Sequence, residues 1–193
     1  EGICAFQENE ALYQETLELL TACLDEISVI GKPLDLEFPC PLDVHCTYTR
    51  TQILAALGFI EDYSISEGVK YLKGKDVDIF FTTLNKANKS YSPTTAYHDY
   101  SINEWLFHWQ SQSTTSETSP TGQRYISRKK GCGHAFLFVR EQKSDRFGAQ
   151  PFVFLGPVYY VKHECSRPMN ITWRLEQPIP AKFLKKTNKL VVG

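Results

Sequence analysis

The chain has 193 residues, with 21 lysines and arginines against 22 aspartates and glutamates, and a formal net charge of −1. This length suits one ordinary hydrophobic core, or a small domain attached to a medium one. No run approaches the roughly 20 apolar residues that a membrane-spanning helix needs, so we expect no membrane contact. The six cysteines form no CxxC pair and follow no apolar targeting run, which favours a reduced, cytoplasmic compartment.

The near-neutral total hides two oppositely charged parts. Residues 1–46 carry ten acids and one base, a net charge of −9, whereas the other 147 residues carry +8. From Thr118 onward there are 14 bases against four acids. Such an excess is typical of a face that binds a polyanion, although solvated loops give the same pattern. Because the only methionine is Met169, we expect the chain to be part of a longer protein.

The acidic part is predicted to be helical. Apolar residues recur every three or four positions between Tyr13 and Ile27, which indicates one apolar stripe on a helix with an acidic outer face. Glycine and prolines between 31 and 41 then break the chain. Thr49 and Gln52 have the spacing of a capping box, which predicts a short helix that Gly58 closes. We therefore predict an acidic helical connector over residues 1–64.

The pattern changes after Ser66 to short runs rich in aromatic and β-branched residues, which predict strands. The fold class expected is α+β, with a β-rich domain over residues 65–193. A polar segment, residues 111–122, is predicted to be a surface loop, and the basic run 128–130 to lie at a hairpin tip. The predicted strands cover residues 69–72, 77–84, 135–139, 152–155, 158–162 and 171–175.

The segment from Tyr97 to Tyr125 concentrates aromatic and amide side chains. Aromatic rings with a polar tip can stack on a nucleobase, and amides can bond to a base edge. The alternative is a core strand, because Trp105, Phe107 and Trp109 alternate with a period of two. Asp99 is likewise open to two interpretations: it can accept a hydrogen bond from the exocyclic amine of cytosine, or it can cap a turn.

The sequence gives little support for metal binding or for catalysis. Cysteine and histidine are neighbours at three places, but the spacings do not match the common structural zinc patterns, so we expect no metal. A thiolate at Cys165 with His163 as base remains an alternative to an inert cysteine. Walker-type loops, GxSxG elbows and HExxH helices are missing from the sequence, so we expect no catalytic residue.

Six blocks of the sequence resemble a known family, in the same order. The chain is similar over roughly residues 47–186 to a C-terminal domain that follows a helicase motor in many bacterial proteins, several of which also carry a phospholipase-D-like nuclease. The best-understood proteins of this architecture are the SauUSI-like, modification-dependent type IV restriction enzymes. The blocks are FFTTLNK (80–86), YSPTTAYHDYSI (91–102), LFHWQSQS (106–113), SPTGQRYI (119–126), FLGPVYYVKHE (154–164) and RPMNITWRLEQPIPAKF (167–183).

The resemblance implies an SRA or PUA-like β-barrel that recognises methylated cytosine in duplex DNA by flipping the base into an aromatic pocket. ATP, Mg²⁺, the motor and the nuclease then belong to other domains of the same polypeptide, and this domain needs no cofactor. Our hypothesis places Tyr97, Asp99, Tyr100, Trp105, Phe107, Trp109, Gln110 and Tyr125 around the base. It places Gln112, Arg124, Arg128, Lys129 and Lys130 against the DNA backbone, which they would grip without reading sequence.

Two other functions compete with this hypothesis. The domain could itself hydrolyse nucleic acid with His98, Asp99 and His108, although it lacks the spacing of paired carboxylates or metal ligands. Alternatively it could be a protein-interaction element that regulates a helicase and docks through the acidic helix.

Overall fold

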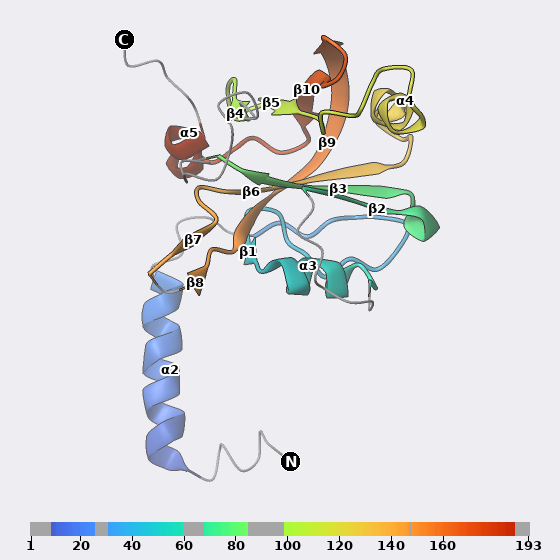
Figure 1. Cartoon of the computed structure of the whole chain (residues 1–193). Coiled ribbons are helices and arrows are strands. Elements are labelled where there is room, and N and C mark those ends of the chain that lie inside the picture. The colour runs from blue at the N-terminus through green and yellow to red at the C-terminus, as the bar shows by residue number, and fades with distance from the viewer. Residues whose placement is uncertain (1–8, 26–30, 60–67, 85–98, 147, 188–193) are drawn as a thin grey trace, which may run out of the picture. The chain divides into compact units, whose positions relative to one another are not determined.

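The structure is a computed structural model that describes residues 9–25, 31–59, 68–84, 99–146 and 148–187. The chain divides into two compact units, residues 1–30 and residues 31–193. The second unit holds a mixed sheet, and the described residues of the first form a helix, as the predicted α+β class requires (Figure 1). None of the described helices combines the length and the apolar character needed to cross a membrane.

The sheet of the second unit runs in the order β2-β3-β6-β9-β10-β5-β4, and β1 pairs with β9. Strands β3 and β6 are parallel, and the other neighbours are antiparallel. The described strands thus form an open sheet with β2 and β4 at its two ends, in the α+β class that we expected. The strands are β1 (Thr47–Tyr48), β2 (Val69–Leu72), β3 (Val77–Thr83), β4 (Tyr100–Ser101), β5 (Leu106–Gln110), β6 (His134–Arg140), β9 (Phe152–Glu164) and β10 (Asn170–Leu175).

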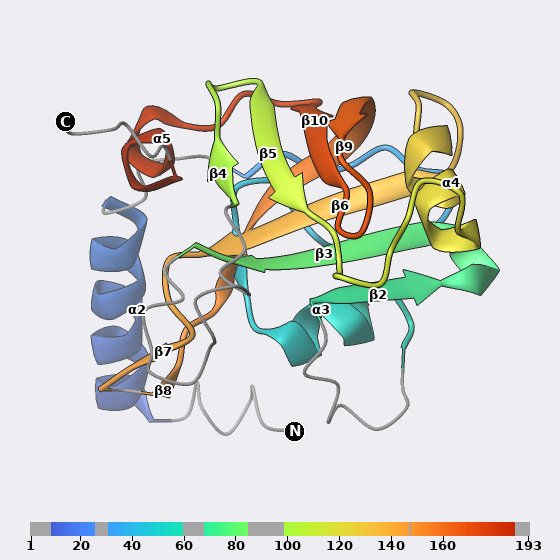
Figure 2. The ribbon, with the colours of Figure 1, turned by 45° about the horizontal axis from the view of Figure 1, so that its top comes forward.

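Short helices and one small hairpin complete this unit (Figure 2). The hairpin pairs β7 with β8 outside the main sheet. These elements are α3 (Arg50–Ala56), the 3₁₀ turn η1 (Lys73–Lys75), α4 (Pro120–Ser127), β7 (Ser144–Asp145), β8 (Gly148–Ala149) and α5 (Ala181–Thr187).

Both faces of the sheet are buried, because side chains of one strand alternate between two cores. On β3, Phe80 lies in one core, whereas Ile79 and Phe81 lie in the other. The second core also takes in Ile53 and Leu54 of α3. Residues that we assigned to the acidic connector therefore belong to the β-rich unit. The boundary between the units lies at 30/31, and not at the predicted 64/65.

Four predicted strands coincide with β2, β3, β6 and β10 to within a residue or two, but the other two, 152–155 and 158–162, fall within the one strand β9. It is a single strand of 13 residues across the predicted break at Gly156. The pairing with β6 shifts register there, and Gly156 has φ 99°. Glycine reaches this region at little cost, so a β-bulge continues β9 across the gap between the two predicted runs.

The predicted polar loop ends in a helix, since α4 begins at Pro120. The hydroxyl of Ser119 accepts a hydrogen bond from the backbone N–H of Gly122 at 3.1 Å, as an N-cap does. Proline directly after the cap suits the first helical turn. The basic run consequently joins α4 to β6 and does not lie at a hairpin tip.

We expect Gly122→Ala to lower the free energy of unfolding by about 1–3 kcal/mol through overpacking. A Cβ at this position would overlap the carbonyl group of Ser116 and lie 3.0 Å from the sulfur of Met169. The Ser116 group is backbone, so it cannot turn aside. Urea denaturation measures the loss, with Gly74→Ala as control because a Cβ there meets no atom within 4 Å. Equal stability of the two variants would contradict the expectation.

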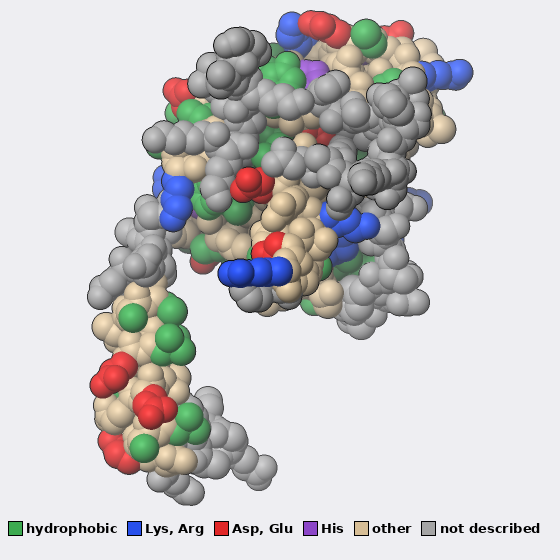
Figure 3. Space-filling view, turned by 60° about the vertical axis from the view of Figure 1, so that its left-hand side comes forward, with side chains coloured by type: hydrophobic (Ala, Val, Ile, Leu, Met, Phe, Trp, Pro, Cys, Tyr) green, Lys and Arg blue, Asp and Glu red, His purple; other side chains and the backbone are tan. Residues whose placement is uncertain are grey.

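The described part of the first unit contains the helix α2 (Glu10–Asp25), which confirms the predicted acidic helix. The backbone N–H of Leu12 donates to the Oδ1 atom of Asn9 at 3.2 Å at its start. Of the residues on the apolar stripe, Leu17 and Leu20 are 39% and 54% exposed. Figure 3 shows hydrophobic side chains gathered toward one side of this helix and acidic ones toward the other.

Candidate ligand-binding site

A hollow of about 120 Å³ lies where the start of β2, the end of β3 and the end of β5 meet. It brings together four of the residues that the sequence suggested, from two separate parts of the aromatic segment. The lining residues are Gly68, Val69, Phe81, Asp99, Trp109, Gln110 and Gln112.

The polar wall of this hollow is built around Asp99, which is 5% exposed. Its Oδ1 atom accepts a hydrogen bond from the backbone N–H of Gln110 at 2.9 Å. The side-chain amide of Gln110 in turn donates to Oδ1 of Asn170 at 2.9 Å. Because that bond engages the donor end of the amide, Gln110 can offer a ligand its carbonyl oxygen. A carboxylate and a carbonyl together suit a ligand edge that carries N–H donors.

The backbone at Gln112 is held by the neighbouring β10 segment. Ser111 and Met169 exchange two hydrogen bonds of 2.9 Å, one through the Ser111 hydroxyl and one through its N–H. The carbonyl of Gln112 accepts from the N–H of Thr115 at 2.9 Å. Ser111 is buried, so this anchoring does not depend on surface side chains. The Gln112 side chain is thereby presented at the hollow from a fixed backbone.

Four of the suggested base-contacting residues that the structure describes lie outside the lining of the hollow, and Tyr100 and Trp105 are two of them. The ring of Tyr100 stacks on His108 with 4.7 Å between centroids and 13° between planes. Trp105 precedes β5 and is 38% exposed. Tyr97 falls outside the described residues. A role for these three residues in base binding stays a prediction.

Phe107 and Tyr125 lie in the hydrophobic core, 0% and 1% exposed. The core-strand alternative is therefore confirmed for β5. Trp109 belongs both to the core and to the hollow. Its ring centroid lies 4.6 Å from that of Phe80, and the residue also lines the hollow. Burial, followed by the charge of Asp78, raises the pKa of Tyr125.

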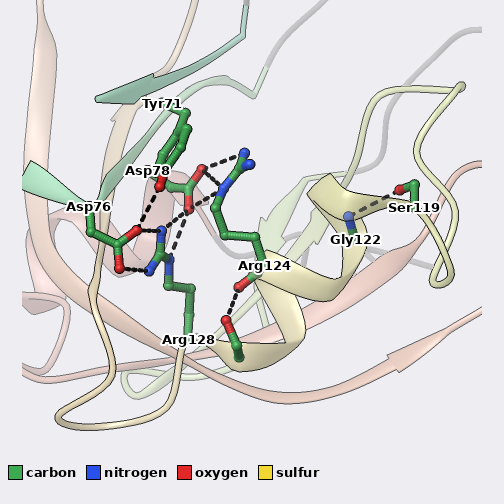
Figure 4. Close-up of polar contacts among 8 residues, drawn as sticks. Tyr71, Asp76, Asp78, Ser119, Gly122, Arg124 and Arg128 are labelled. Atoms are coloured by element: carbon green, nitrogen blue, oxygen red, sulfur yellow. Dashed lines mark hydrogen bonds and ion pairs between the residues drawn. The ribbon is translucent and has the colours of Figure 1, made fainter. Parts of the chain in front are cut away.

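The two arginines that we placed on the DNA backbone are bound to aspartates inside the fold (Figure 4). Arg124 holds Asp78 through Nε–Oδ1 and Nη2–Oδ1 contacts of 3.0 Å. Arg128 bonds Asp76 at 2.7 and 2.8 Å, and its Nε reaches Asp78 at 2.9 Å. Arg128 is 2% exposed, so its assignment to a phosphate contact is corrected. Both cations are neutralised within the molecule.

The ion-pair cluster formed by Asp76, Asp78, Arg124 and Arg128 shows opposite shifts at its two acids. The hydrogen bond between Asp76 and Arg128 lowers the pKa of Asp76 to about 2. Burial raises the pKa of Asp78, and the two guanidiniums oppose that rise. Burial disfavours the charged form of Arg128, but its bonds to both aspartates outweigh this and raise its pKa. Tyr71 adds a hydrogen bond to Asp76 at 2.9 Å and lies 3.9 Å below the Arg124 guanidinium.

Sequence reasoning missed both aspartates and the apolar wall of the hollow. A signal for Asp78 was present, because an acid inside a run of buried strand residues needs a cationic partner. Gly68, Val69 and Phe81 carried no such signal. They lie 31 to 44 positions before Gln112 in the chain, and only the sheet brings them to β5.

The geometry around His163 does not support its role as a base for a Cys165 thiolate. Both ring nitrogens of His163 are hydrogen-bonded, Nδ1 to the Tyr160 hydroxyl at 2.6 Å and Nε2 to the Glu117 carboxylate at 3.1 Å. The base that Cys165 would need is therefore held by other groups. Within the described parts of the chain, no three histidine, cysteine or acidic side chains gather as a metal site would require.

A family model matches residues 42–186, about three quarters of the chain, under the description "Domain of unknown function (DUF3427)". Among curated proteins no sequence matches the chain. A similar solved structure is that of Arabidopsis thaliana SUVH6 in complex with SAM, with 14% sequence identity and a TM-score of 0.42. That similarity covers 79% of this chain but only 29% of the other. The match to the family model shows that the chain belongs to the DUF3427 family.

Proposed function

We propose that this domain binds duplex DNA and holds a flipped 5-methylcytosine in the hollow at the end of β5. The observation that carries the proposal is the lining of that hollow. One indole, one carboxylate and two amides converge there from β5, from Gln112 just after it and from the residue before β4. A flipped base needs these partners: a ring to pack on, acceptors for its amine, and a polar rim.

The size of the hollow supports a small planar ligand. Pockets for drug-sized ligands span roughly 300–1,000 Å³, whereas this one measures about 120 Å³. Discrimination of the 5-methyl group adds only a small apolar contact, worth on the order of 1 kcal/mol. Val69, Phe81 and Trp109 supply an apolar wall for that methyl group.

The sequence resemblance extends the proposal to the parent protein. We propose that the domain is the SRA or PUA-like recognition module of a type IV restriction enzyme in the cytoplasm. Helicase and nuclease domains of the same polypeptide would use ATP and Mg²⁺, and this domain would use neither. Magnesium-dependent cleavage of DNA by the purified domain would contradict a purely binding role.

The direct test compares binding to two duplexes that differ only in one 5-methylcytosine, at two salt concentrations. A preference of tenfold or more, about 1.4 kcal/mol, supports the proposal. Equal affinity for the two duplexes would contradict recognition of the methylated base and would indicate only nonspecific DNA binding.

Asp99→Asn is expected to reduce the preference for the methylated duplex by tenfold or more without unfolding the domain. The amide keeps an acceptor for the N–H of Gln110 but replaces the charged acceptor offered to the base amine. Hydrogen bonds to charged groups contribute about 1.5–3 kcal/mol, so a loss of this order is expected. Titration calorimetry measures the affinities, with Glu104→Gln as a charge-matched exposed control. An unchanged preference in Asp99→Asn would place the base elsewhere.

A second candidate function is protein interaction through α2, favoured by its open apolar side. Leu12 and Leu19 are 46% and 64% exposed, as are Leu17 and Leu20 to similar extents. Contiguous exposed apolar residues commonly mark contacts with other proteins. Co-purification of the helicase domain that depends on these leucines, but not on DNA, would support this second function.

A further inference from the structure

Four lysines gather at the end of the sheet where β2 turns into β3. Lys73 and Lys75 lie in η1, and Lys129 and Lys130 follow α4. Figures 1 and 2 both place α4 and the β2–β3 connection at this end. Lys73, Lys75, Lys129 and Lys130 are called the lysine cluster below.

Direct bonds hold the two halves of the lysine cluster together. Asp76 follows Lys75, Arg128 precedes Lys129, and the Asp76–Arg128 pair spans 2.7 and 2.8 Å. A further bond of 3.0 Å joins the N–H of His134, beyond the turn, to the carbonyl of Asp76. The lysines of η1 and those of the turn are therefore neighbours in space, although 54 or more positions separate them in the sequence.

The turn that carries Lys129 and Lys130 has a fixed shape. The N–H of Cys132 donates to the carbonyl of Lys129 at 2.9 Å, and Gly131 and Gly133 have φ 84° and 63°. A Cβ at Gly133 would overlap the Arg128 guanidinium and the Asp76 carboxylate. Only glycine fits at position 133, because the backbone of the turn packs directly against the Asp76–Arg128 ion pair. Lysines on such a turn lose less backbone entropy when they bind a ligand.

The charge of the lysine cluster is not balanced by the acids beneath it. Asp76 and Asp78 are matched by Arg124 and Arg128, so the ion-pair cluster is neutral. Among the described residues, none of the four lysines forms an ion pair. Three of them are exposed, and Lys75 is half-buried with its ammonium 4.8 Å from the ring of Phe38. The acid next to that ring, Glu37, bonds His134 at 2.9 Å.

The lysine cluster and the hollow lie at the two ends of edge strand β2. Gly68 and Val69 line the hollow, and Leu72 is the residue before η1. Three steps along a strand span about 10 Å. Since successive phosphates of one DNA strand lie about 3.4 Å apart along the helix axis, a duplex that enters the hollow reaches the cluster within a few phosphates.

We propose that the lysine cluster binds the phosphodiester backbone of DNA beside the base held in the hollow. This inference rests on the proposed function, and it replaces the arginines of α4 as the backbone contact. Lysine ammonium groups are compact charges that contact phosphates without reading sequence. The cluster would fix the register of the duplex, and the hollow would read the base.

The test replaces all four lysines of the cluster by glutamine. A matched control replaces Lys32, Lys143, Arg174 and Lys182 by glutamine, which removes the same charge from other exposed positions. Affinity for methylated and unmethylated duplexes is measured across salt concentrations. Each lost phosphate contact reduces the magnitude of the negative slope of log K against log salt by about 0.9. We expect this magnitude to fall by about 3.6 in the cluster variant, which loses four contacts, and by less than 1 in the control.

The outcomes separate this inference from the proposed function. A shallower slope with an unchanged methyl preference supports both. A shallower slope in a protein that has no methyl preference supports the cluster and rejects the base reader. Equal slopes in the cluster variant and the control overturn the cluster, whatever the methyl preference. Lysine-dependent binding to vesicles of anionic lipid, with none to DNA, would also overturn it.

Discussion

Replacing Asp78 by asparagine is expected to lower the free energy of unfolding by about 3–5 kcal/mol. Asp78 is 0% exposed, and Arg124 and Arg128 both bond its carboxylate. Removing one partner of a buried ion pair leaves an uncompensated charge inside the protein, which gives a loss of this size. Asparagine keeps the shape of the side chain, so the loss reports charge and not volume. Denaturation in urea at neutral pH measures it.

Asp76→Asn is the matched control, because the Asp76 side chain is 53% exposed and bonds only Arg128 of the two arginines. We expect a much smaller loss, since water screens that pair. Arg128 holds the pKa of Asp76 near 2, below its usual 3.8, so its contribution is present above pH 4 and disappears as the pH falls toward 2. Equal losses in the two variants would contradict the assignment of Asp78 as the centre of the cluster.

Trp109→Ala is expected to destabilise the domain by about 3–5 kcal/mol, the usual range for truncation of a buried tryptophan. Trp109 is 4% exposed and packs against Phe80, Tyr125 and Trp173, with centroids 4.6, 5.6 and 6.4 Å away. The variant leaves a cavity among these rings, which the paired strands on either side keep from closing. Thermal unfolding followed by near-ultraviolet circular dichroism measures the change.

Trp105→Ala serves as the comparison, because Trp105 precedes β5 and is 38% exposed. We expect it to change stability far less. If Trp109→Ala unfolds at the temperature of the parent domain yet loses methyl preference, Trp109 is a pocket residue without a core role. A loss of stability instead means that the less invasive Asp99→Asn is the better probe of the hollow.

The strand positions were predictable, and the reason is local. The runs at β2, β3, β6 and β10 are rich in aromatic and β-branched residues, which suit a pleated, buried surface. Prediction failed where a local signal had two meanings. Gly156 and Pro157 signal a turn, but here they form a bulge within β9. Ser119 and Pro120 signal a loop equally well as the start of a helix, which is what they form.

The candidate site was predictable in part. Asp99, Trp109, Gln110 and Gln112 stood out by side-chain chemistry, and they line one hollow. The same chemistry misplaced Arg128, because its partners lie 50 and 52 residues earlier in the chain. The sequence does not distinguish a basic residue that binds a phosphate from one that pairs with a buried carboxylate.

The amino-acid sequence by itself determined the α+β class, the acidic helix α2 and the positions of β2, β3, β6, β9 and β10. These depend on periodicity and composition within short windows, which the chain carries locally. Only the tertiary structure decided which charged side chains form ion pairs within the fold and which remain available to a ligand. That division depends on the pairing of β3 with β6 and the packing of α4, which bring Asp76 and Asp78 to Arg124 and Arg128. Burial and charge pairing join residues far apart in the chain, so no local pattern encodes them.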